Sequence, residues 1–140
     1  MVDLPEVVND ATVEIVRRAK ETYIVATPEL PSLVLANQRR KELIKRRILD
    51  ERIGVILNRW QKTEINIQDI EEFLNRPVSF VLPNDYHSVR RAVQEGRLIG
   101  KRSELGRSLS TFAGTLTPTA VPETAPAKGG HSLLGSFLRK

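Results

Sequence analysis

Three short apolar segments constrain the fold of this chain more than any other feature of its sequence. They are TYIVAT (Thr22–Thr27), RIGVILN (Arg52–Asn58) and VSFVLP (Val78–Pro83), each nearly continuous in apolar residues and rich in Val and Ile. Strands that are buried on both faces of a parallel sheet have this composition, whereas a strand with one face in water alternates between apolar and polar residues. The sequence therefore predicts a parallel sheet with helices in the connections between its strands.

Helical patterns precede and separate these segments. Asp10–Ala19 repeats apolar residues at helical spacing, and Pro31–Ile48 begins with a proline, which suits the first position of a helix. The residues expected to face the core are Val13, Val16 and Ala19 in the first helix and Leu33, Ala36, Leu43, Ile44 and Ile48 in the second.

The segment after the second apolar run has the clearest local signature of a helix start. Asn66 is suited to cap a helix, and Ile65 and Ile70 have the spacing of a hydrophobic staple. A further helix is expected over Tyr86–Gln94, with Gly96 as its C-terminal stop. This alternation predicts an α/β fold, namely a partial doubly wound, mainly parallel sheet flanked by helices.

Length, charge and cysteine content set bounds on the function. At 140 residues one domain is expected, and the net charge of +5 permits association with nucleic acid or an anionic membrane without indicating either. Disulfides are excluded because the chain has no cysteine, and no metal site is expected from His87 and His131, which lie far apart in the sequence. The chain has no signal peptide pattern and no run near the roughly 18 apolar residues of a membrane span. The sequence thus predicts a cytoplasmic protein, or one attached peripherally to the inner face of the cell membrane.

Composition changes after about Leu116. The stretch TPTAVPETAPAKGG has three prolines, two glycines and no apolar period, so residues 116–130 are predicted to be a flexible, disordered linker. Residues 131–140 follow as HSLLGSFLRK, in which apolar residues recur at the spacing of one helix face. This end is predicted to be a short amphipathic membrane-binding helix, and a frayed tail is the alternative. The residues of the predicted membrane contact are Leu133, Leu134, Phe137, Leu138, Arg139 and Lys140.

Four segments, in this order along the chain, resemble one protein family. They are VDLPEVVNDATVEIVRRA, YIVATPELPSLVLA, GVILNRW and VSFVLPNDYHSVRRAVQEG, all within Val2–Gly100. They resemble the C-terminal half of MinD/ParA-like ATPases with a deviant Walker A motif, and are most similar to the CpaE/TadZ branch, which acts in Flp (Tad) pilus assembly. The resemblance implies a P-loop NTPase-like fold over residues 1–115. It also implies ATP and Mg²⁺ as cofactors of a complete parent, a homodimer of that parent, and pilus assembly components as partners.

One departure from the family limits what this chain can do alone. The sequence contains no G-x-x-x-x-G-K-[ST] loop, whose backbone N–H groups and lysine would hold the phosphates of ATP. We therefore expect no ATP hydrolysis by this chain by itself. The resemblance implies a C-terminal portion of an ATPase, a remnant, or a gene model begun at an internal methionine. The alternatives are a ParA-like partition module that associates with DNA non-specifically, or a gene fragment without function.

The start of the chain, MVDLP, is predicted to be the tail of a further strand, and the first candidate site residues follow from the ends of this segment and of the second apolar run. Asp3 resembles the Walker B or switch II acid, which in a complete parent would act on the Mg²⁺ shell and the attacking water. Its alternative role is to cap the turn before Asp10. Asn58 and Arg59 follow the second strand, where a side-chain amide can bond the edge of adenine, as the resemblance implies. Asn58 is alternatively a simple turn former.

The sequence LPND ends the third predicted strand at the same edge of the sheet. Pro83 cannot donate to a strand ladder and so ends it, which leaves Asn84 and Asp85 beyond the strand. The resemblance implies that these three residues form a second adenine-side loop. Asp85 is alternatively the N-cap of the next helix, and both roles are compatible.

Basic residues gather in two parts of the chain. A solvated helix face explains them most simply, and non-specific binding to DNA is the alternative, which retention on DNA with a steep salt dependence would indicate. The basic residues are Arg39, Arg40, Lys41, Lys45, Arg46 and Arg47 in one group, and Arg90, Arg91, Arg97, Lys101, Arg102 and Arg107 in the other.

Overall fold

The computed structural model describes residues 1–62 and 65–116. The predicted membrane-binding tail, and the predicted linker apart from Leu116, lie outside the described residues. The elements in chain order are α1 (Asp10–Arg18), β1 (Thr22–Ala26), α2 (Leu30–Lys45), a short 3₁₀ turn (Asp50–Arg52), β2 (Ile53–Trp60), α3 (Ile67–Leu74), β3 (Phe80–Pro83), α4 (Tyr86–Gln94) and α5 (Glu104–Leu116).

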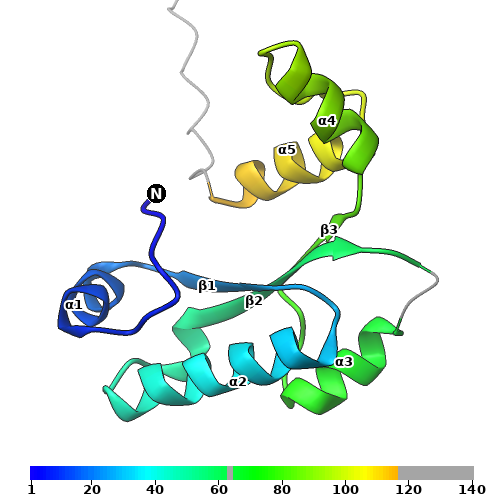
Figure 1. Ribbon diagram of the computed structural model, residues 1–140. Helices are drawn as coiled ribbons and strands as arrows, with labels where there is room; N and C mark the ends of the chain where they lie inside the picture. The colour runs from blue at the N-terminus through cyan, green and yellow to red at the C-terminus, as the bar shows by residue number, and fades with distance from the viewer. Residues whose placement is uncertain (63–64, 117–140) are drawn as a thin grey trace, which may run out of the picture.

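The three predicted strands form one parallel sheet in the order β1–β2–β3. Helices α2 and α3 lie on one face of this sheet and α5 lies on the other (Figure 1). The predicted α/β class, a mainly parallel sheet flanked by helices, is therefore confirmed. All three strands end at one edge, because parallel strands share their direction.

The main core lies between the sheet and the α2–α3 layer. Val55 and Leu57 of the central strand are 1% and 0% exposed, and Ile70 and Leu74 of α3 pack with them. Leu33 and Ala36 of α2 complete this cluster, as their helical spacing predicts. Asn66 caps α3 by accepting a hydrogen bond from the backbone of Gln68, which explains where that helix begins.

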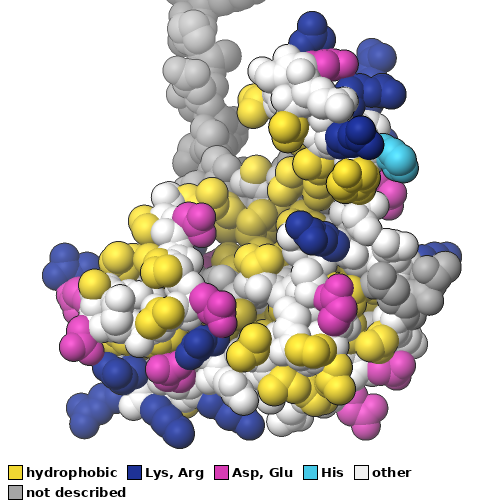
Figure 2. All heavy atoms as spheres, in the orientation of Figure 1, with side chains coloured by type: hydrophobic (Ala, Val, Ile, Leu, Met, Phe, Trp, Pro, Cys, Tyr) yellow, Lys and Arg dark blue, Asp and Glu magenta, His cyan; other side chains and the backbone are white. Residues whose placement is uncertain are grey.

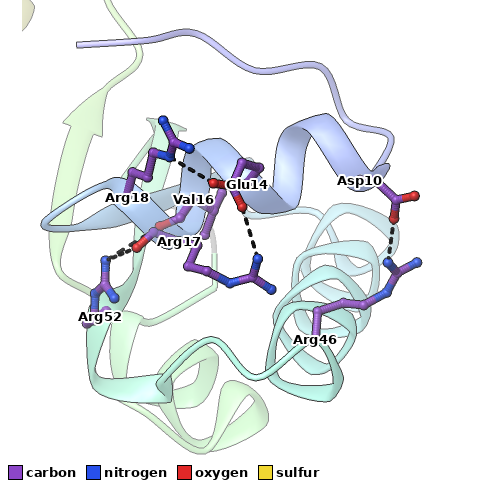
Figure 3. A network of polar contacts seen from close by, with 7 residues as sticks. All are labelled: Asp10, Glu14, Val16, Arg17, Arg18, Arg46 and Arg52. Carbon is purple, nitrogen blue, oxygen red and sulfur yellow. Dashed lines mark hydrogen bonds and ion pairs between the residues drawn. The ribbon is translucent and has the colours of Figure 1, made fainter.

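A smaller core and a polar network attach α1 to the sheet. Val16 of α1 packs with Leu43, Ile48 and Ile53, all of them buried. At the C-terminal end of α1, Arg52 donates to the carbonyl oxygens of Val16 and Arg17, a position where a positive charge favours the helix dipole (Figure 3).

Two nearly buried arginines share one carboxylate at the end of α2. Arg40 makes a two-pronged contact with Asp50, with Nε 2.6 Å from Oδ1, and also donates to the carbonyl oxygen of Leu74. Arg76 Nη1 lies 3.2 Å from Asp50 Oδ1. The Arg40 and Arg76 side chains are only 15% and 14% exposed. Asp50 therefore links α2, the turn before β2 and the connection from α3 to β3.

The second face of the sheet is covered less completely. Phe112 of α5 contacts Tyr23 and Phe80, with ring centroids 5.3 Å and 5.1 Å apart. Val25 of β1 is 59% exposed, so the prediction that all three strands are buried on both faces is wrong for β1. The reason is that α5 packs mainly against β3, while Phe112 contacts Tyr23 near the start of β1.

Three further details differ from the sequence-based expectation. Met1–Pro5 is not a strand, because Leu4 packs against the smaller core while Pro5 can donate nothing to a ladder. Ile44 is 38% exposed, since neighbouring helix residues point about 100° apart and Leu43 already faces inward. Helix α5 was not predicted. Within the described ranges, no helix is both long and apolar enough to cross a membrane.

Candidate functional site

A cavity lies at the edge of the sheet where β2 and β3 end. Its volume is about 530 Å³. Ligands of open α/β sheets bind outside the carboxyl ends of the strands, which is this edge. The lining residues are Trp60, Gln61, Lys62, Pro83, Asn84, Asp85, Tyr86, His87 and Glu104.

The end of β3 is attached directly to the end of β2. Pro83 lies opposite Trp60 in the strand register, and the backbone N–H of Asn84 donates to the carbonyl oxygen of Trp60 at 3.0 Å. Pro83 ends the ladder as expected, and the predicted group of Pro83, Asn84 and Asp85 does line one cavity. The backbone at this point is therefore held by the sheet rather than by a free loop.

Asp85 caps α4, as its alternative interpretation predicts. Its carboxylate accepts a hydrogen bond from the backbone N–H of Ser88 at 3.2 Å. A hydrogen bond from the side chain of Ser88 is the main cause that lowers the pKa of Asp85, and backbone N–H groups of Ser88 and Leu105 and the charge of His87 lower it further. Leu105 belongs to α5, so the Asp85 carboxylate lies near the N-terminal ends of both α4 and α5, beside the cavity.

We expect Asp85→Ala to lower the melting temperature by a few degrees, because the N-terminal N–H groups of α4 lose their acceptor. Asp85→Asn is the matched control, since its amide oxygen still caps the helix. Because the pKa of Asp85 is lowered in the folded state, its stabilising effect is present above the unfolded pKa and is lost as the pH falls through the folded value. Thermal melts between pH 7 and about 3 check both points. Equal melting of wild type and Asp85→Ala would contradict the capping role.

Trp60 forms one wall of the cavity and was not singled out by the sequence analysis. Its ring packs partly against the main core. Its Nε1 atom is buried and has no hydrogen-bond partner among the described residues. Buried donors without a partner are uncommon and costly, so this N–H is a candidate contact for a ligand. A tryptophan directly after Asn58 and Arg59, at a strand end, was the sequence signal that could have found it.

The predicted residues Asn58 and Arg59 lie at the same edge but do not line the cavity. Asn58 Oδ1 accepts a hydrogen bond from the backbone N–H of Arg59 at 3.0 Å. Arg59 has a φ of 60° at an irregularity in the β2–β3 register, a strained conformation of the kind that is often found at functional sites. A hydrogen bond from Thr27 is the main cause that lowers the pKa of Glu29, and the charge of Arg59 contributes. The Arg59 side chain is therefore close to Glu29, the residue that precedes α2.

Asp3 lies away from this cavity in the described structure. It is exposed and belongs to the irregular N-terminal segment. Glu104, in contrast, lines the cavity although nothing in the sequence pattern indicated it, because only the return of α5 to the sheet brings it there.

Half of the basic residues in and just after α2 are engaged within the molecule. Arg39 pairs with Glu42 at 2.8 Å and lies 3.6 Å from Glu6. Arg46 pairs with Asp10 at 2.9 Å (Figure 3). Together with the Asp50 contact of Arg40, these pairs explain three of the six basic residues of this helical segment by structural roles.

Solved structures of two bacterial ATPases are similar to this chain. The ParA family ATPase from Chlorobium tepidum TLS matches it with a TM-score of 0.69 and 28% sequence identity, over 78% of this chain and 46% of that chain. MinD of Aquifex aeolicus matches with a TM-score of 0.64 and 19% identity, over 77% of this chain and 48% of that chain. The chain has a MinD/ParA-like fold. It spans about half the length of these ATPases.

A third similar structure contains a nucleotide. It is MinD of Pyrococcus horikoshii OT3 complexed with Mg-ADP, with a TM-score of 0.58 and 22% identity over 70% of this chain and 41% of that chain. No family model and no curated protein matches this chain.

Proposed function

We propose that this chain is the adenine-side, C-terminal portion of a MinD/ParA-like ATPase, and that its cavity receives the base of an adenine nucleotide. The observation that carries the proposal is the position of the cavity between Trp60 and Pro83–Asp85, at the carboxyl edge of a parallel sheet. The similarity to a solved ParA family ATPase at 28% identity supports it.

The residues present fit the base of the nucleotide. The ring of Trp60 offers an apolar wall. The amide of Asn84 offers one acceptor and one donor, which is the pattern that pairs with adenine N6 and N7. We further propose that Asn58, which lies at the end of β2 outside the cavity lining, contacts the base after its side chain exchanges the hydrogen bond with the Arg59 backbone for one with the nucleotide.

The same residues do not fit the phosphates and the metal ion. Lys62 is the one lysine or arginine among the described residues that lines the cavity, and the sequence has no phosphate-binding loop. Within the described residues, no group of three Asp, Glu or His side chains could hold a metal ion. When bound to a complete parent, ATP would supply the phosphoanhydride bond that the ATPase reaction hydrolyses. In a complete parent, the phosphate loop would come from residues other than these, and Asp3 would act on the Mg²⁺ shell.

The fluorescence of Trp60 provides a direct test, because it is the single tryptophan of the chain. We expect AMP and ATP to quench it with similar, weak affinities in the millimolar range, since most of the binding surface for phosphates is not supplied. UMP should quench less. Asn84→Ala should weaken AMP binding several-fold, whereas Gln68→Ala, which removes an exposed amide on α3, should leave it unchanged.

Two outcomes would contradict this proposal in different ways. Micromolar ATP binding or Mg²⁺-dependent phosphate release would show that the chain holds more than the adenine side. Equal quenching by AMP and UMP, unaffected by Asn84→Ala, would show that the cavity is not a base site.

We also propose a finer assignment that rests on the sequence segments quoted above. It places the parent in the CpaE/TadZ branch, acting as a homodimer in Flp pilus assembly or polar positioning. The parent would be cytoplasmic and associate peripherally with the inner face of the membrane through residues 131–140. Failure of the parent to associate with pilus assembly components in pull-down would remove this assignment without affecting the base site.

A further inference from the structure

Helix α4 and the loop after it expose apolar side chains at one end of the molecule. Val93 is 74% exposed and Leu98 is 95% exposed, while Tyr86 and Val89 of the same helix are 62% and 40% exposed. None of the residues of α4 is buried. The helix stands away from the sheet, beyond α5 (Figure 1). We call Val93, Leu98 and the basic residues around them the α4 tip.

The segment that carries these apolar residues is predominantly cationic. Residues 86–107 include six basic and two acidic residues, a net charge of +4. Among the described residues only Arg97 of these six forms an ion pair, a long one of 3.9 Å with Glu95. Figure 2 shows Lys and Arg side chains gathered over α4 with hydrophobic side chains beside them. The six are Arg90, Arg91, Arg97, Lys101, Arg102 and Arg107.

The loop that carries Leu98 is held at both ends. Gly96 adopts a φ of 59°, and the backbone N–H of Arg97 donates to the carbonyl oxygen of Ala92 at 2.9 Å, as in a Schellman motif. At the other end Ser103 donates to the carbonyl oxygen of Gly100 at 2.7 Å. A side chain at Gly106 would come within 2.1 Å of that same oxygen, so the loop lies directly on α5. Leu98 is therefore presented to solvent by an ordered loop.

We propose that the α4 tip binds the surface of an anionic lipid bilayer. Val93 and Leu98 enter the interface, and the surrounding guanidinium and ammonium groups contact the headgroups. Apolar side chains ringed by Lys and Arg are the pattern of segments that lie in such an interface, where each basic residue adds electrostatic attraction.

Other occupants explain fewer of these observations. Nucleic acid would use the cations but would leave the apolar side chains in water. A protein partner usually meets apolar residues in a complementary, packed patch, whereas Val93 and Leu98 protrude singly with charges between them. The inference is independent of the proposed nucleotide site and of the proposed tail at residues 131–140.

The test is flotation of the full chain with vesicles of phosphatidylglycerol and phosphatidylcholine in equal parts, and with phosphatidylcholine alone. All chains carry Leu134→Glu and Phe137→Glu, so that the proposed tail contributes nothing. The test variant is Val93→Ser/Leu98→Ser, which removes apolar surface without a change of charge. The matched control is Val7→Ser/Leu30→Ser, two side chains 63% and 57% exposed at other positions.

The reference chain carries only the two tail substitutions. We expect it to float with the anionic vesicles only, and less at high salt because the charges are screened. The test variant should bind at least about tenfold more weakly, which corresponds to about 1.4 kcal/mol, and the control should bind as the reference chain does. Thermal melts confirm that each variant is folded.

Failure of the reference chain to bind anionic vesicles at low salt overturns the proposal. Equal binding by the test variant and the reference chain overturns it too, and so does retention on non-specific DNA without vesicle binding.

Discussion

Replacing Asp50 by asparagine is expected to lower the free energy of unfolding by about 2–3 kcal/mol. The substitution leaves Arg40 and Arg76, which are 15% and 14% exposed, facing one another without a counter-charge. Breaking a fully buried pair costs about 3–5 kcal/mol, and we expect less here because the Asp50 side chain is 44% exposed and therefore screened by water. Burial and the charge of Arg40 already lower the pKa of Arg76, which shows that the two cations oppose each other.

The same network predicts a pH dependence. The hydrogen bonds from Arg40 are the main cause that lowers the pKa of Asp50, and the charges of Arg40 and Arg76 contribute. A lowered folded-state pKa means that the stabilisation is present above the unfolded value of about 4 and is lost as the pH falls through the folded value. Wild type should thus lose more stability than Asp50→Asn as the pH falls below about 4.

Urea unfolding of three proteins provides the measurement. Asp10→Asn is the matched control, because it also removes the carboxylate of an ion pair with an arginine, Arg46, but the Asp10 side chain is 98% exposed. We expect less than about 0.5 kcal/mol for that exposed pair. If Asp50→Asn and Asp10→Asn lower the free energy of unfolding equally, the Asp50 contacts stabilise the protein no more than an exposed ion pair does.

Replacing Leu57 by alanine is expected to lower the free energy of unfolding by about 3 kcal/mol or more. This is the largest effect of any side-chain truncation that we propose. Leu57 is 0% exposed in the central strand, between the sheet and the α2–α3 layer, and large-to-small changes at such positions cost about 2–5 kcal/mol. Its neighbours in the same cluster include Ile70 and Leu74, which α3 holds in place and which cannot refill the cavity.

The comparison for Leu57→Ala is Leu30→Ala, because Leu30 is 57% exposed at the start of α2. That change should stay within about 0.5 kcal/mol. The fluorescence of Trp60 should also change in Leu57→Ala, since the irregularity that aims Trp60 at the cavity begins at Leu57. A cost below about 1 kcal/mol would mean that this part of the core is loosely packed.

The strands and most helices could be predicted because their signals are local. Continuous Val- and Ile-rich runs identify β1, β2 and β3 to within two residues at either end, and Tyr86–Gln94 matches α4 as predicted. Helix α5 escaped prediction because Glu104–Leu116 contains two glycines and several Ser and Thr residues, which weaken a helical pattern in the sequence. Its contacts with the sheet, such as that of Phe112, compensate for this weak propensity.

The candidate site could be predicted only in part. The end of β3 was identified from Pro83, Asn84 and Asp85, since a proline after an apolar run ends a strand wherever it occurs. Grouping Asn58 with them assumed that residues at one edge meet at one cavity. Asn58 does not line the cavity, and its side chain accepts a hydrogen bond from the backbone of Arg59, whose φ is 60°.

The sequence by itself determined the parallel α/β class, the edge of the sheet at which a site can form, and the lack of a phosphate-binding loop. These follow from residue types and local order, which do not depend on distant contacts. Only the tertiary structure decided which residues share the cavity, that Val25 remains exposed on β1, and that Asp50 serves two arginines from different elements. The physical reason is that burial and pairing depend on where α5 and the α3–β3 connection pack against the sheet. Those positions are set by contacts between residues far apart in the sequence, which no local pattern predicts.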